Sequence, residues 1–95
     1  MEYRKEIEGF IDAHKDEMIE DICTLCRINS EKKPYVEGKP YGEGAFEALQ
    51  AALAMAEGYG FTINNYDNYV GTADLNDKER HLDILAHLDV VPAGE

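Results

Sequence analysis

The sequence predicts an α/β fold in which two helices pack on one side of a small three-stranded sheet. Two stretches with apolar residues at helical spacing, followed by three short stretches of strand character, indicate this class. The length of 95 residues suits one domain or a piece of one. Hydrophobic residues make up 44% of the composition, which favours a folded chain with a small core over a disordered one.

The first predicted helix runs from about Arg4 to Arg27. Its apolar residues recur every three or four positions, as one stripe of an amphipathic helix requires, and the residues between them are mostly acidic. The stripe consists of Ile7, Phe10, Ile11, His14, Met18, Ile22, Leu25 and Cys26. Cys23 and Cys26 form a Cys-x-x-Cys motif near the end of this helix, where the helix dipole opposes a thiolate. We therefore expect buried, reduced cysteines here, and a packed or edge position for His14.

A long loop and a second helix follow. Residues 29–44 contain two prolines and three glycines and show no periodic pattern, which predicts a loop. Loops of this length are usually functional or disordered. From Ala45 to Ala56 the apolar spacing is helical again and the composition is rich in strong helix formers. The segment Gly58-Tyr59-Gly60 is expected to end this helix.

Three strands complete the predicted fold. Phe61–Tyr66 and Tyr69–Leu75 alternate in polarity, and the Asp67-Asn68 turn between them predicts an antiparallel pair. His81–His87 becomes more apolar toward its end. This third strand is expected to be solvated at His81 and buried at His87.

Charge and hydropathy exclude several classes of partner. The formal net charge is −11 and the few basic residues form no cluster, so we expect no binding to nucleic acid. No apolar run approaches the ~18 residues that cross a bilayer, so we expect no membrane association. Two cysteines are too few for a fold that is held together by several disulfide bonds. The composition predicts a soluble, cytoplasmic protein.

The residues with the clearest chemistry are His87 and Asp89. Side chains two positions apart on a strand point to the same face, and here the strand opens into a loop that begins at Pro92. A neutral imidazole is a good zinc ligand, and a neighbouring carboxylate can fix its ring. On these residues alone, an ordinary hydrogen-bonded pair is the commoner interpretation.

The sequence around this pair resembles that of a known family. Residues 86–95, Ala-His-Leu-Asp-Val-Val-Pro-Ala-Gly-Glu, look like the first metal-binding motif of the M20 metallopeptidases. Further segments are similar in order and spacing to the amino-terminal part of the PepV-like dipeptidase branch, from about Ile7 to Glu95. They are Leu25–Ser30, Tyr41–Gly44, Gly60-Phe61 and Asp67-Asn68. The fold implied is the amino-terminal part of a zinc-peptidase (phosphorylase/hydrolase-like) catalytic domain.

The resemblance implies a role for two residues. His87 matches the ligand of one of two zinc ions, and Asp89 matches the catalytic-site aspartate that orients this ligand. The other ligands and the glutamate base of that family come later in the chain, so residues 1–95 are expected to be an incomplete piece of the catalytic domain. The parent protein would be a cytoplasmic metallo-dipeptidase that hydrolyses dipeptides with metal-activated water. The isolated chain is expected to be inactive.

A second class of function remains open. The 95 residues could be a non-catalytic interaction module, or a truncated gene product, that keeps the peptidase amino-terminal fold. A reading frame that continues into further acidic motifs would favour the enzyme, and a stop codon after Glu95 would favour the module. In either form, the apolar last strand predicts self-association of this chain.

Overall fold

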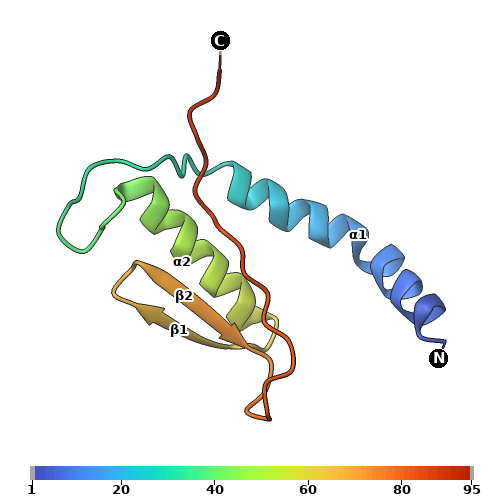
Figure 1. Cartoon of the computed structure of the whole chain (residues 1–95). Helices are drawn as coiled ribbons and strands as arrows, with labels where there is room; N and C mark the ends of the chain where they lie inside the picture. Colours follow the sequence, from blue (N-terminus) through green and yellow to red (C-terminus); the bar gives the residue numbers. More distant parts are fainter. Residues whose placement is uncertain (1, 95) are drawn as a thin grey trace.

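The computed structural model describes residues 2–94. The elements follow in the order α1 (Arg4–Cys26), α2 (Glu43–Gly58), β1 (Thr62–Tyr66) and β2 (Val70–Asp74). The β1–β2 hairpin lies against α2, and α1 extends away from the hairpin on the other side of α2 (Figure 1). The predicted helices and the predicted α/β character are therefore present.

The hairpin forms as the sequence predicts. β1 and β2 are antiparallel, with Thr62 opposite Asp74 and Tyr66 opposite Val70. Asp67 and Asn68 both have positive φ, at 55° and 64°, and the Tyr69 amide donates to the Tyr66 carbonyl oxygen across 3.0 Å. This backbone turn matches the right-handed twist of the strands, and Asp and Asn are among the residues that adopt it most readily.

The predicted third strand is wrong for this structure. Within residues 2–94 the sheet has two strands, and residues 81–87 run as an extended segment outside it (Figure 1). Just after this segment, Val90 forms one isolated parallel β-bridge with Glu31. A strand requires a partner edge as well as a suitable side-chain pattern, and no described backbone edge pairs with residues 81–87. His87 is accordingly exposed, and the expectation of a buried end was also wrong.

The core is confined to the contact between α2 and the hairpin. Ala48, Leu49 and Leu53 are the buried apolar residues of the described chain. Gly71 of β2 lies directly over this helix face, because a Cβ atom added there would meet Leu53 Cδ2 at 2.7 Å. The absent side chain at Gly71 is therefore what allows α2 to approach the sheet so closely.

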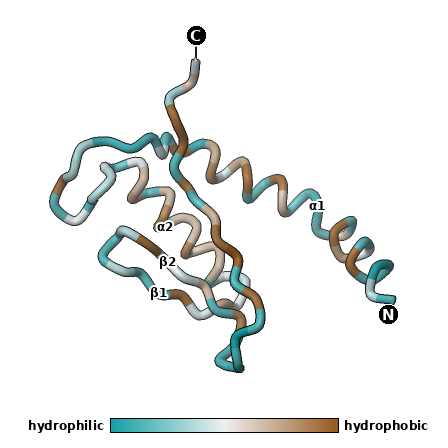
Figure 2. The backbone as a smooth tube through the Cα atoms, viewed as in Figure 1, coloured by the Kyte–Doolittle hydropathy of each residue, from teal (hydrophilic) through white to brown (hydrophobic). Residues whose placement is uncertain are grey.

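The prediction that both helices pack on the sheet is wrong for α1. α1 contacts α2 but neither strand, and none of its residues is buried. Apolar positions recur along the helix (Figure 2), and the large apolar side chains among them, such as Ile7 and Phe10, are exposed. Cys26 is exposed and Cys23 half-buried, so the expected burial of the two thiols is not seen, although both are free. The apolar stripe correctly predicted an amphipathic helix. No other part of the described chain buries that stripe.

One polar contact ties the two helices together. The Tyr59 hydroxyl, just after α2, donates a hydrogen bond to the Asp21 carboxylate of α1. The hydrogen bonds to Asp21 and Glu17 raise the pKa of Tyr59 above its ordinary value, because they favour the protonated phenol. Among residues 2–94, no helix is both long enough and apolar enough to cross a membrane.

Candidate functional site

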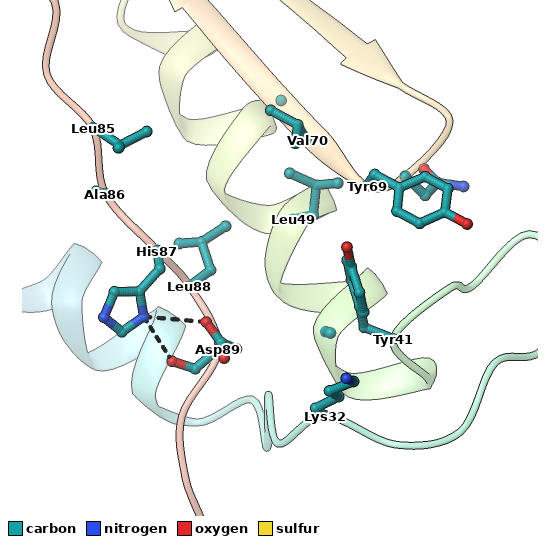
Figure 3. A pocket seen from close by; sticks show the side chains of 13 residues that line it. Lys32, Tyr41, Leu49, Tyr69, Val70, Leu85, Ala86, His87, Leu88 and Asp89 are labelled. Carbon is teal, nitrogen blue, oxygen red and sulfur yellow. Dashed lines mark hydrogen bonds and ion pairs between the residues drawn. The ribbon is translucent and has the colours of Figure 1, made fainter.

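A groove of about 390 Å³ separates the extended segment 85–89 from α2 and β2 (Figure 3). Leu49 of α2 lines it, and Val70 and Gly71 of β2 form one wall. Tyr41, Tyr69 and Lys32 lie toward one end. The groove therefore has mainly apolar walls, with polar side chains at its margin.

His87 and Asp89, the two residues singled out from the sequence, lie together on the segment that borders this groove. His87 Nδ1 is 3.1 Å from Asp89 Oδ1 and 3.1 Å from the Asp89 carbonyl oxygen. Both partners are acceptors, so Nδ1 carries the proton and donates. In the neutral ring, the remaining nitrogen, Nε2, then holds the lone pair with which imidazole binds a metal.

Both side chains are open to solvent. The His87 side chain is 84% exposed and that of Asp89 is 59% exposed. The His87 ring projects away from the side on which Leu88 faces α2 (Figure 3). The pair is thus reachable by a ligand from solvent.

The backbone beside His87 is anchored to the loop that follows α1. The Ser30 hydroxyl, which is buried, donates a hydrogen bond of 2.7 Å to the Leu88 carbonyl oxygen. The Val90 amide donates to the Ser30 carbonyl oxygen across 3.3 Å. The same loop packs closely on α2, because a Cβ atom at Gly44 would lie 1.7 Å from the Asn29 carbonyl oxygen.

These anchoring roles were not found from the sequence. Ser30 and Gly44 occur in a stretch that shows only a loop signal, and their partners are distant along the chain. A hydrogen bond between residues 58 positions apart leaves no periodic trace in the sequence.

Asn68 anchors the hairpin turn at the part of the groove that Tyr41 and Tyr69 line. Its side-chain amide donates to the Gly38 carbonyl oxygen at 2.7 Å, and its side-chain oxygen accepts from Gln50 of α2 at 3.2 Å. The turn is thereby tied to both the loop and the helix. Next to it, the Tyr41 and Tyr69 rings meet edge to face, with centroids 5.5 Å apart.

The described residues do not complete a metal site. Within 2–94, no group of three or more His, Cys, Asp or Glu side chains lies close enough together to hold a metal ion. A catalytic zinc ion needs about three protein ligands. His87 with Asp89 therefore fits one ligand position and its orienting carboxylate.

Comparison with known proteins shows what the whole chain is similar to. The chain is 35% identical over 86 residues to the Beta-Ala-Xaa dipeptidase of Lactobacillus delbrueckii subsp. lactis, a match that covers 88% of this chain. It is 35% identical over 83 residues to the putative dipeptidase YtjP of Bacillus subtilis, covering 85% of this chain. The chain is therefore similar in sequence to one segment of proteins that are named dipeptidases.

The chain spans only 18% of the length of these two relatives. A putative dipeptidase of Staphylococcus epidermidis, 33% identical over 84 residues, is covered to the same 18%. No family model matches the chain. The similarity therefore relates this chain to a small part of much longer proteins.

Proposed function

We propose that this chain forms part of the catalytic domain of a zinc-dependent dipeptidase of the M20 type, in its PepV-like branch. In this proposal His87 binds one of two zinc ions and Asp89 holds the His87 ring. The observation that carries the proposal is the hydrogen bond from His87 Nδ1 to Asp89, which leaves Nε2 free on an exposed ring. The dipeptidase names of the relatives support the reaction class.

The residues of this chain would prepare one ligand. Asp89 accepts the Nδ1 proton and so sets both the tautomer and the orientation of His87. Ser30 holds the backbone between them through the Leu88 carbonyl. Bound zinc would supply a water of lowered pKa and polarise the scissile carbonyl. The other ligands and the general base would come from outside the residues described.

The dipeptide class of substrate is taken from the names of the relatives. The groove lined by Leu49 and Val70 lies on the side of the segment opposite to the His87 ring, so the proposal does not place the substrate in it. The name of one relative makes dipeptides with an amino-terminal β-alanine the first substrates to test.

We further propose that the protein acts in the cytoplasm. Cys23 and Cys26, the two cysteines of the sequence, are both free thiols in the structure. Free thiols suit a reducing compartment.

The test uses the whole protein encoded by the gene. Dipeptide hydrolysis and zinc content are measured for the unchanged protein, for His87→Ala and for His81→Ala. The control, His81, is an exposed histidine of the same extended segment. We expect His87→Ala to lose most activity together with bound zinc, while His81→Ala keeps both. Full activity and full zinc content in His87→Ala would overturn the proposal.

A further inference from the structure

Gly44, in the first turn of α2, touches the loop after α1 at a point where no side chain fits. A Cβ atom added to Gly44 would overlap the Asn29 carbonyl oxygen, and it would lie 2.8 Å from the carbonyl carbon and 3.6 Å from the Ser30 Cα atom. Gly44 lies inside a helix, so its backbone conformation is one that any residue adopts. The close approach is therefore what requires glycine at this position.

The part of the loop that Gly44 touches also holds the carboxyl-terminal segment, which crosses it just after α1 (Figure 1). The Ser30 hydroxyl donates to the Leu88 carbonyl oxygen across 2.7 Å, and the Ser30 carbonyl oxygen accepts from the Val90 amide across 3.3 Å. The two bonded groups belong to the peptide units on either side of Asp89. Because Ser30 is only 2% exposed, its hydroxyl bond is shielded from competition by water.

One of these peptide units reaches the His87 ring. The unit between Asp89 and Val90 donates its N–H to Ser30 and offers its carbonyl oxygen to His87 Nδ1, 3.1 Å away. The Asp89 carboxylate, also 3.1 Å from Nδ1, is attached to the same stretch of backbone. A rotation or shift of this peptide unit would therefore move both acceptors of the Nδ1 proton and change the orientation of the ring.

The contacts thus form a continuous path from α2 to His87. The Gly44 backbone rests on the loop backbone, and the loop is bonded to the peptide unit that His87 contacts. Closely packed backbone yields little, so a displacement at one end of such a path is passed on to the other. Neither Gly44 nor Ser30 touches the His87 ring, and their effect on it is indirect.

We propose that Gly44 and Ser30 are positioning residues for the candidate metal ligand His87. The first turn of α2 fixes the loop at Ser30, and the loop fixes the peptide unit after Asp89. That peptide unit and the Asp89 carboxylate then orient the His87 ring before a metal binds. This inference rests on the proposed function, in which His87 binds zinc, and adds to it two residues that act on the ligand through other residues.

The first experiment compares two changes from glycine to alanine in the same helix. Nothing lies within 4 Å of a Cβ atom added to Gly58, at the other end of α2, so Gly58→Ala is the matched control for Gly44→Ala. The zinc dissociation constant of the whole protein encoded by the gene is measured by competition with a chelator. Gly44→Ala is expected to raise this constant by about threefold or more, because the loop must move. Gly58→Ala should leave it unchanged, and equal zinc affinities in the two folded variants would overturn the proposal.

The second experiment tests the same path without adding an atom, so it decides the matter if Gly44→Ala does not fold. Ser30→Ala removes the hydroxyl bond to Leu88 and is expected to raise the zinc dissociation constant by about tenfold. Thr24→Ala, which removes a hydroxyl of α1, is the control. Both are measured at a temperature at which circular dichroism shows an intact fold. Lower thermal stability of Ser30→Ala with unchanged zinc affinity would show a merely structural role and would overturn the proposal.

His87→Ala separates a failure of this inference from a failure of the proposed function. If His87→Ala keeps its zinc, the proposed function fails. If His87→Ala loses zinc while Ser30→Ala and Gly44→Ala bind it normally, only the positioning roles fail. The double variant of Gly44→Ala with Ser30→Ala should weaken zinc binding by less than the product of the two single effects, because both act through one contact. Effects that multiply fully would overturn the common path.

Discussion

The Ser30 hydroxyl donates a 2.7 Å hydrogen bond to the carbonyl oxygen of Leu88, the residue next to His87. This contact links the loop after α1 to the segment that carries the candidate metal ligand. Ser30 is also the only buried polar residue of the described chain. Ser30 thus holds the backbone between His87 and Asp89 against the loop that precedes α2.

Replacing Ser30 by alanine is expected to destabilise the fold. The change removes the hydrogen bond to Leu88 and should lower the free energy of unfolding by about 1 kcal/mol. Thermal denaturation followed by circular dichroism measures the effect. The matched control is Thr24→Ala, which removes a hydroxyl bonded to the Glu20 carbonyl oxygen on the exposed surface of α1. Equal losses of stability in the two variants would show that the Ser30 hydrogen bond contributes no more than an exposed one.

Replacing Gly71 by alanine is expected to disturb the core. The new Cβ atom would lie 2.7 Å from Leu53 Cδ2 and 3.0 Å from Leu49 Cδ1, so α2 must shift or repack. Overpacking of this kind costs about 1–3 kcal/mol. Gly9→Ala in α1 is the control, since nothing lies within 4 Å of its added Cβ atom. There the better helix propensity of alanine should raise stability, and a denaturant titration of both variants would show the opposite signs.

The 95-residue chain by itself should neither hydrolyse dipeptides nor bind zinc tightly. Within residues 2–94, His87 with its partner Asp89 would supply one ligand, and no group of three or more donors is present. Titration calorimetry at neutral pH is expected to show no stoichiometric submicromolar binding. Tight binding that disappears in His87→Ala would contradict this expectation. Tight binding that disappears in Cys23→Ser would instead reveal a thiolate site in α1.

In the whole protein, Asp89→Asn is expected to lower activity while preserving the fold. The amide can still accept the Nδ1 hydrogen bond but lacks the negative charge that favours a well-oriented metal-bound imidazole. Changes to such orienting partners typically cost about 10–100-fold in metal affinity or activity. Kinetics and zinc content are measured together, with Asp83→Asn, on the same exposed segment, as the control. Unchanged turnover and zinc content in Asp89→Asn would show that the pair is only structural.

The sequence by itself determined the local elements. The helical spacing predicted α1 and α2 to within two residues of the observed bounds at each end. Asp67-Asn68 predicted the hairpin turn, because these residues accept the positive φ that the turn requires. The His87–Asp89 pair was also found from the sequence, since residues two apart along an extended chain can meet without help from the rest of the fold.

Only the tertiary structure decided which of these elements are covered. The apolar pattern of residues 81–87 predicted a buried strand, yet no described edge pairs with it and Leu85 stays exposed. The stripe of α1 likewise predicted packing on the sheet, but α1 reaches only α2. A side-chain pattern shows only which face of a segment is suited to burial. Burial also requires a second surface, and contacts such as Ser30 with Leu88 depend on chain segments that meet only after folding.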